Sequence, residues 1–208
     1  NTRFNPCKLS PTLAKKWELD VLDKTRGPWS TPIVAGGRIY FYTADAVHCL
    51  DEATGKTVWK SERPPKNSGT YNDCSPSMTI GSGLVWAEGP LVNAYAVGDG
   101  KPSYVCTVNN QGEYGLHASF VYHNGQVYAA GGCKTNKTVT FYAINALNGS
   151  HCWTWTQPDQ DKHFTASVYE RGHPIEAPPA VVDGRIYFGS TDGHINCLEE
   201  TTGKQVWR

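Results

Sequence analysis

The chain has 208 residues, of which 39% are hydrophobic and 12% aromatic, with 21 glycines and 13 prolines. That composition is typical of a β protein with many tight turns and with room for one or two domains. Its 19 basic and 19 acidic residues cancel, and the lack of a basic stretch argues against nucleic-acid and anionic-membrane binding. No apolar run approaches the roughly 20 residues that a membrane-spanning helix needs.

After a leader predicted over residues 1–13, the first clear unit covers about residues 30–62. Short apolar runs separated by glycine-containing turns predict four antiparallel strands here. The runs span residues 31–35, 38–43, 46–51 and 57–62. Gly55 is expected in a turn conformation that a β-carbon would resist. Trp59 is expected to cover the edge between two neighbouring sheets.

Three more units follow, at about residues 75–108, 117–156 and 177–208. The last unit repeats the first closely, with Gly-Arg-Ile-Tyr-Phe and then Thr-Gly-Lys-x-Val-Trp in both. The turn glycines stand at 55, 100, 149 and 203, spaced by 45, 49 and 54 residues, and each follows a small residue by six positions. These small residues are Cys49, Ala94, Ala143 and Cys197. Four strands in a repeating unit of about 45 residues predict the blades of a β-propeller.

Residues 49–59 and 197–207 resemble the A-x-D-x-x-T-G-K-x-x-W pattern of the PQQ-like, or quinoprotein alcohol dehydrogenase-like, β-propeller repeat family. The resemblance covers about residues 14–208, closely in the first and fourth units and loosely in the second and third. It implies an all-β fold of blades with four antiparallel strands each. An ordinary β-sandwich with accidental repetition is the alternative.

The number of strands predicts an incomplete ring. Residues 13–19 look like the outer strand of a blade whose other strands do not precede it, with Trp17 placed 42 residues before Trp59. Four blades plus this extra N-terminal strand, ending at Arg208, would leave a sheet face exposed unless another chain covers it. We expect a homodimer, which would give an eight-bladed ring, or a complementary chain. Closure of four blades alone is the alternative, in which the strands of Trp17 and Trp207 compete for one place.

Seven cysteines and two glycosylation sequons, at Asn136 and Asn148, favour a secreted protein that folds in an oxidising compartment. Cys49 and Cys197 occupy the small position of the repeat, so they are expected to be buried free thiols. Cys7 lies on the leader and is the candidate for an interchain disulfide. The pairing of the remaining cysteines stays open, because the sequence does not choose between the bridges that they could form.

Candidate ligand-binding residues come from two kinds of segment. Residues that enter each innermost strand should rim a central channel, and long irregular stretches between blades should form loops beside it. The rim and its neighbours supply Trp29, Tyr71, Asp73, Cys74, His117 and Glu176, and the stretch 157–176 adds His163, Arg171 and His173. The alternative for each is a solvated loop residue or, for Trp29, a packing aromatic.

Enzymes of the family that this chain resembles are quinone-dependent alcohol and aldehyde dehydrogenases, with PQQ and calcium in the central funnel. Many have a disulfide between adjacent cysteines beside the cofactor, whereas this sequence has no adjacent cysteine pair. It also lacks the ligand spacing of a zinc site. We therefore expect a non-catalytic recognition protein without cofactor or metal, which binds a polar ligand such as a carbohydrate, or a protein partner.

Two alternatives stay open. One is a PQQ-dependent alcohol dehydrogenase-like enzyme or subunit whose funnel another chain completes. The other is a scaffold for protein assembly, like the bacterial outer-membrane assembly propellers of the same family, although the sequons disfavour a bacterial context. No catalytic residue is assigned, because neither a Ser/His/Asp order nor a phosphate-binding loop is recognisable.

Overall fold

The computed structural model describes residues 14–20, 30–43, 45–63, 77–88, 92–106, 118–133, 138–157, 175, 177–190 and 193–208. These residues form sixteen β-strands and no helix, so the part of the chain described contains no helix that could cross a bilayer. The strands assemble into four antiparallel sheets of four strands each. The predicted all-β fold of four-stranded blades is therefore confirmed.

Each sheet is a meander, in which strands consecutive in the chain are neighbours in the sheet, and we number the sheets as blades 1 to 4. Blade 1 contains β1 (Ile33–Ala35), β2 (Arg38–Tyr42), β3 (Ala46–Asp51) and β4 (Thr57–Glu62). Blade 2 contains β5 (Thr79–Gly81), β6 (Leu84–Glu88), β7 (Val92–Ala96) and β8 (Pro102–Cys106). Blade 3 contains β9 (Val121–His123), β10 (Gln126–Cys133), β11 (Thr138–Asn145) and β12 (His151–Thr156). Blade 4 contains β13 (Ala180–Val182), β14 (Arg185–Gly189), β15 (Ile195–Glu199) and β16 (Gln205–Trp207).

The same register recurs in every blade. The small residue of the third strand pairs with the aromatic residue of the fourth, and these pairs are Cys49–Trp59, Ala94–Tyr104, Ala143–Trp153 and Cys197–Trp207. A β-bulge follows the small residue in all four sheets. All four small residues are at most 1% exposed, so a larger side chain there would overpack the sheet.

A tight turn joins the third and fourth strands of each blade. The amide of its glycine donates a hydrogen bond of 2.8–2.9 Å to the carbonyl oxygen four residues earlier, and φ lies between 70° and 72° at Gly55, Gly100, Gly149 and Gly203. That backbone conformation is the left-handed region, which favours glycine. The glycine spacing seen in the sequence therefore marks one turn in four copies.

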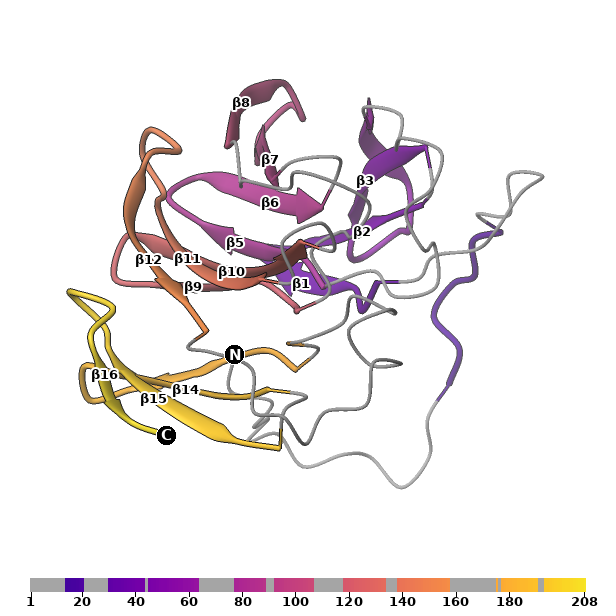
Figure 1. Ribbon diagram of the computed structural model, residues 1–208. Coiled ribbons are helices and arrows are strands. Elements are labelled where there is room, and N and C mark those ends of the chain that lie inside the picture. The colour runs from indigo at the N-terminus through magenta and orange to yellow at the C-terminus, as the bar shows by residue number, and fades with distance from the viewer. Residues whose placement is uncertain are drawn as a thin grey trace.

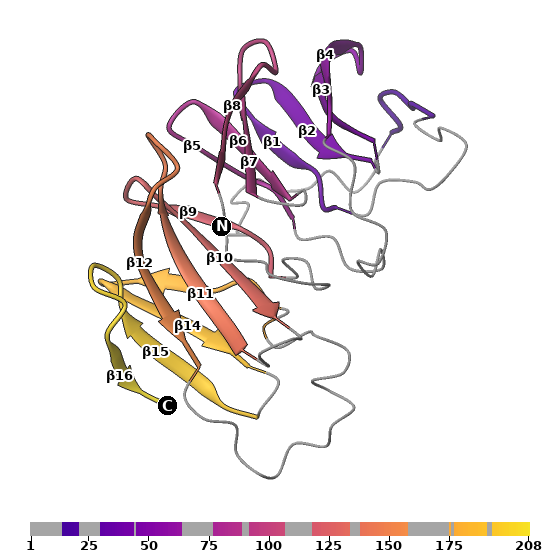
Figure 2. The ribbon, with the colours of Figure 1, turned by 45° about the horizontal axis from the view of Figure 1, so that its top comes forward.

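The blades follow one another along an arc in chain order, with blade 1 at one end and blade 4 at the other (Figures 1 and 2). A buried apolar cluster fills each of the three spaces between neighbours. Tyr40 and Tyr42 of blade 1 pack with Val85 and Tyr95 of blade 2. The corresponding cluster between blades 3 and 4 includes Phe141, Trp155, Ile186 and Phe188. Burial of these aromatic faces stabilises the stack of sheets.

The predicted N-terminal outer strand is wrong for the described residues 14–20, which form no strand. A strand needs ladder partners for its backbone groups, and no sheet of the described chain includes this segment. Trp17 nevertheless occupies the position expected of an outer-strand aromatic. Its Nε1 donates to the carbonyl oxygen of Glu52 at 2.9 Å, and its ring lies against Gly55 in the turn of blade 1.

Candidate functional site

A cavity of about 580 Å³ lies where the first strands of all four blades converge. Its walls come from the residues within or just before these strands. The lining residues are Thr31, Pro32, Ile33, Val34, Ser77, Met78, Ser119, Val121, Tyr122, His123, Pro178, Pro179, Ala180 and Val181. The convergence makes this space the central channel of the propeller, and its volume suits a small organic molecule.

The wall between blades 2 and 3 is fixed by hydrogen bonds from backbone amides of one blade to side-chain hydroxyl groups of the other. The amide of Ser77 donates to Ser119 Oγ at 3.0 Å, and the amide of Tyr122 donates to Thr79 Oγ1 at 3.2 Å. The Tyr122 ring covers Gly81 so closely that a β-carbon at position 81 would overlap it. Hydroxyl and aromatic groups are thus held on one rigid side of the cavity.

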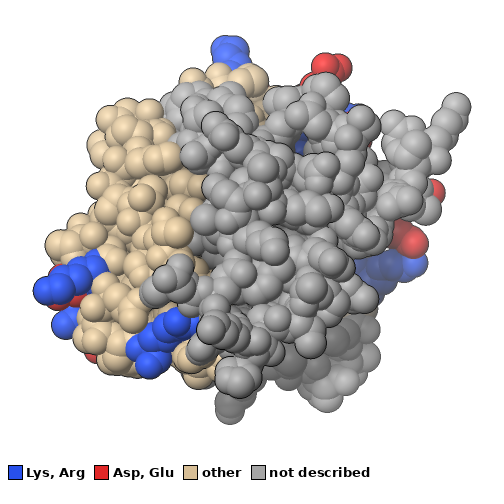
Figure 3. Space-filling view, viewed as in Figure 1, with Lys and Arg blue, Asp and Glu red and all other residues tan. Residues whose placement is uncertain are grey.

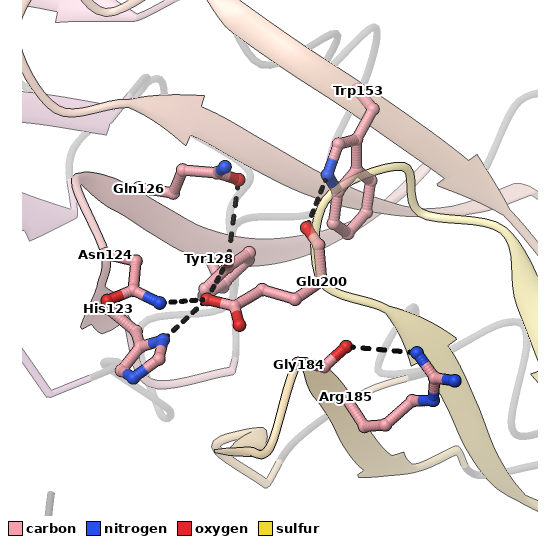
Figure 4. Close-up of polar contacts among 8 residues, drawn as sticks. All are labelled: His123, Asn124, Gln126, Tyr128, Trp153, Gly184, Arg185 and Glu200. Carbon is pink, nitrogen blue, oxygen red and sulfur yellow. Dashed lines mark hydrogen bonds and ion pairs between the residues drawn. The ribbon is translucent and has the colours of Figure 1, made fainter.

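A buried carboxylate reaches this wall from blade 4 (Figure 4). His123 Nδ1 lies 2.5 Å from Glu200 Oε1, while Asn124 Nδ2 and the Tyr128 hydroxyl each lie 3.3 Å from the same oxygen. Trp153 Nε1 donates to the Glu200 carbonyl oxygen at 2.9 Å. Burial, followed by the negative charge of Glu200, raises the pKa of the Tyr128 phenol, which therefore stays protonated as a hydrogen-bond donor.

The ligand-binding residues predicted from the sequence cannot be placed. Those residues all lie outside the described part of the chain: Trp29, Tyr71, Asp73, Cys74, His117, His163, Arg171, His173 and Glu176. Cys7 and the sequon residue Asn136 also lie outside it, whereas Asn148 is exposed in the β11–β12 turn. Ser77, Ser119 and Tyr122 line the cavity but were not predicted from the sequence. They lie only a few residues after the predicted rim positions of their blades, so an alignment of the blades extended by a few residues would have included them.

His123 and Glu200 were also missed, and no signal in the sequence links them. They stand 77 residues apart, and Glu200 takes the position that Glu52 holds in blade 1. Among the described residues, the thiols of Cys49 and Cys197 are free and buried, as predicted, and that of Cys152 is free and exposed.

Comparison with known proteins identifies the repeats. Residues 135–208 match a PQQ-repeat family model described as "Outer membrane protein assembly factor BamB". The 1-butanol dehydrogenase (quinone) of Thauera butanivorans is 28% identical over 136 residues, which are 63% of this chain and 20% of that protein. The repeats of this chain are thus similar to those of PQQ-repeat proteins.

Two further similarities extend over most of the chain. The dehydrogenase subunit of the quinone alcohol dehydrogenase from Gluconobacter oxydans is 23% identical over 200 residues, which are 92% of this chain and 20% of that protein. The structure of the quinohemoprotein alcohol dehydrogenase ADHIIG from Pseudomonas putida matches with a TM-score of 0.72 at 20% identity, over 89% of this chain and 34% of that one. The chain thus spans about a fifth of the length of the curated relatives and corresponds to part of a propeller.

The described lining of the cavity does not fit PQQ with calcium. Calcium takes oxygen ligands, above all carboxylates, and the described lining contains no Asp or Glu and also no Lys or Arg. Among the described residues, no group of three His, Cys, Asp or Glu side chains could hold a metal ion. The acidic candidates Asp73 and Glu176 lie outside the described residues. The described lining therefore supplies no carboxylate ligand for a calcium ion.

Blade 4 has an uncovered face. Tyr187 and Trp207 of blade 4 stand with ring centroids 6.0 Å apart, as Tyr40 and Trp59 do in blade 1. Trp59 is 7% exposed beneath blade 2, whereas Trp207 is 47% exposed. Val182 and Ile195, on the same face of blade 4, are 50% and 62% exposed. An aromatic and aliphatic surface built for packing is thus left open to solvent.

Charged side chains form no single large patch on the face shown in Figure 3. The Lys and Arg side chains of the described residues appear there in small, separate groups, and acidic groups lie beside some of them. The uncovered face of blade 4 and the central cavity are two features that the described residues offer for binding.

Proposed function

We propose that this chain supplies four blades of a larger PQQ-like propeller whose central cavity binds a small, neutral, hydroxylated molecule such as a carbohydrate. The observation that carries the proposal is the cavity of about 580 Å³ bounded by all four blades. Its described polar groups are the hydroxyls of Thr31, Ser77, Ser119 and Tyr122 and the imidazole of His123. These neutral donors and acceptors suit hydroxyl groups better than they suit a strongly charged ligand.

Binding without oxidation is favoured by the chemistry of the lining. The described walls contain no carboxylate or cation, and the chain has no adjacent cysteine pair. The apolar groups of Ile33, Val121 and Val181 can pack against the carbon skeleton of a sugar while the hydroxyl groups fix its orientation.

The binding proposal is tested with a variant that fills the cavity. Ala180 lines the cavity and is exposed, so Ala180→Phe adds volume there without overpacking the core. The matched control is Leu147→Phe, at an exposed residue outside the lining. A glycan array followed by calorimetry should detect binding by the wild type and by Leu147→Phe but not by Ala180→Phe. A silent array for the wild type would rule out carbohydrate as the ligand.

The second candidate function is quinone-dependent alcohol oxidation. It is supported by the relatives, of which a 1-butanol dehydrogenase and an alcohol dehydrogenase subunit match 63% and 92% of this chain. Incubation with PQQ and Ca²⁺, followed by a dye-linked assay with 1-butanol, tests it directly. Dye reduction that requires both additions would favour the enzyme. Loss of all PQQ on gel filtration would favour the binding protein.

The uncovered face of blade 4 supports completion of the ring by a further blade. In each described contact between an indole and the next turn, Nε1 donates to a carbonyl oxygen and the ring lies on the glycine three residues later. In a homodimer, Trp207 of one copy would have to pack on Gly55 in blade 1 of the other. The ring of Trp17 already lies against Gly55, so this position is occupied. We therefore favour an additional PQQ-like blade over a homodimer.

Because the chain has seven tryptophans, sedimentation and the acrylamide quenching of the fluorescence that Trp207→Phe removes test ring completion. The 208-residue chain is expected to be a monomer in which Trp207 is quenched readily. A dimer that protects Trp207 would favour the homodimer, and a monomer that protects it would indicate closure of four blades.

Secretion and glycosylation form a separate proposal, supported by the exposure of Asn148 in its turn. Expression in a eukaryotic secretory host should add one glycan at that position, detectable as a mass shift that Asn148→Gln removes. An unmodified Asn148 in the secreted protein would contradict this assignment.

A further inference from the structure

An imidazole at the wall of the central cavity is held by a carboxylate from the neighbouring blade (Figure 4). His123 lines the cavity, and its Nδ1 lies 2.5 Å from Glu200 Oε1. The Glu200 side chain is 7% exposed, while that of His123 is 40% exposed. Nδ1 of His123 therefore contacts the buried Glu200 carboxylate, and the rest of the ring is accessible from the cavity.

The surroundings of Glu200 decide which ring nitrogen carries the proton. Asn124 Nδ2 and the Tyr128 hydroxyl both approach Oε1, the same oxygen that His123 Nδ1 contacts. The two assigned donors at this oxygen, the Asn124 amide and the Tyr128 hydroxyl, match an ionised carboxylate, which only accepts hydrogen bonds. Nδ1 of His123 must then donate, so the neutral ring presents the lone pair of Nε2. No hydrogen bond joins Nε2 to another residue in the described part of the chain.

Hydrogen bonds to both backbone groups of Glu200 fix the position of this residue. The carbonyl oxygen of Glu200 accepts the indole N–H of Trp153 at 2.9 Å, and its amide donates to the carbonyl oxygen of Gly184 at 2.9 Å. The turn that follows is closed by the hydrogen bond from Gly203 to Glu199. Because the position of Glu200 is fixed within the protein, Glu200 orients the His123 ring before any ligand binds.

We infer that His123 Nε2 accepts a hydrogen bond from a hydroxyl group of the molecule bound in the central cavity, with Glu200 as the positioning residue for His123. The inference rests on the cavity function proposed above. Ser119 and Tyr122 line the same wall as His123, so a second hydroxyl of the ligand can be bound nearby. An alcohol or a sugar has the hydrogen that Nε2 requires, whereas an ether of the same shape lacks it.

Nitrogen NMR of the full chain labelled with ¹⁵N-histidine tests the tautomer directly. The chain has seven histidines, and the signals of residue 123 are those that disappear in His123→Asn. At a pH where the ring is neutral, the proton is expected on Nδ1, and addition of D-glucose or 1-butanol should shift the Nε2 signal. The methyl ether of 1-butanol should leave it in place. A proton on Nε2 in the ligand-free protein would overturn the inference.

Two substitutions separate ligand contact from blade packing. His123→Asn keeps an amide donor where Nδ1 stands and removes the acceptor at Nε2. It is expected to weaken binding of the better of the two probes about 3- to 10-fold, the effect of one lost neutral hydrogen bond, while the unfolding midpoint stays close to that of the wild type. Glu200→Gln keeps the shape of the side chain but removes its charge, and should give a mixture of both tautomers at residue 123.

The outcomes distinguish this inference from the proposed function. Probe binding that is equal in the wild type and in His123→Asn overturns the role of His123 and leaves the cavity as the binding site. Failure of the wild type to bind either probe overturns both the cavity function and this role. If His123→Asn fails to fold, the response of the Nε2 signal to 1-butanol and to its ether in the wild type decides.

Discussion

The indole ring of Trp153 in blade 3 lies against Gly203 in the turn of blade 4, and its Nε1 donates to the carbonyl oxygen of Glu200 at 2.9 Å. The same contact joins blades 1 and 2, where Trp59 lies on Gly100 and donates to Val97 at 3.0 Å. Glycine is therefore required at positions 100 and 203 for two reasons. The backbone φ is positive there, and a β-carbon would overlap the indole ring.

Gly203→Ala should destabilise the protein more than Gly184→Ala does. Both glycines belong to blade 4 and have φ near +70°, so both substitutions cost about 1–2 kcal/mol of backbone strain. A β-carbon at Gly184 meets no atom within 4 Å, whereas at Gly203 it meets the ring of Trp153. Overpacking should add about 1–3 kcal/mol at position 203. Urea unfolding measures the difference, and equal losses would show that the indole moves aside freely.

Trp59→Ala should cost far more stability than Trp207→Ala in the 208-residue chain. Trp59 is 7% exposed between two blades and Trp207 is 47% exposed at the uncovered face. Removing a buried aromatic side chain costs about 3–5 kcal/mol, and we expect less than half of that at Trp207. The two residues share the same register position, so local sheet effects cancel in the comparison. A large loss at Trp207 would indicate that another surface covers it in solution.

Protonation of His48 should destabilise the folded chain in mild acid. Burial, followed by the positive charge of Lys60, lowers the pKa of His48 below its ordinary value of 6.5. The unfolded state therefore takes up this proton first, and the contribution of the neutral ring is lost as the pH falls below about 6.5. The free energy of unfolding should decline from about pH 7 to pH 5, a range in which Asp45, with its lowered pKa, stays ionised.

His48→Phe provides the control for this pH dependence. It keeps an aromatic ring where His48 stacks on Phe41, with centroids 4.8 Å apart, and removes the titrating group. The acid-dependent loss should shrink in the variant. An unchanged slope would assign the loss to other groups.

The cysteines should differ in their rates of reaction with a thiol reagent. Cys152 is exposed, whereas Cys49 and Cys197 are 0% and 1% exposed. Of these three cysteines, Cys152 should therefore be the first to carry label when native protein is treated with iodoacetamide and digested for mass spectrometry. Labelling of the other two should wait for unfolding, because the reagent reaches only an accessible thiolate. Rapid labelling of Cys197 would show that blade 4 opens at its uncovered face.

The strands of the first blade could be predicted closely because their determinants are local. The runs 46–51 and 57–62 are strands with those bounds, since turn glycines and β-branched or aromatic runs specify hairpins by short-range geometry. The described part of the segment predicted as a strand, residues 14–19, forms none for a non-local reason. A ladder needs a neighbour, and in the described chain the segment has none.

The sequence by itself determined the repeat: small residue, turn glycine and aromatic at fixed intervals specify one blade, because each acts within a single hairpin. Only the tertiary structure decided what lies between blades. It placed Glu200 against His123 across 77 residues of chain and gave Trp59 and Trp207 opposite environments despite the same motif. Those outcomes depend on which blades are neighbours. A sequence pattern confined to one hairpin does not specify the blade that packs against it.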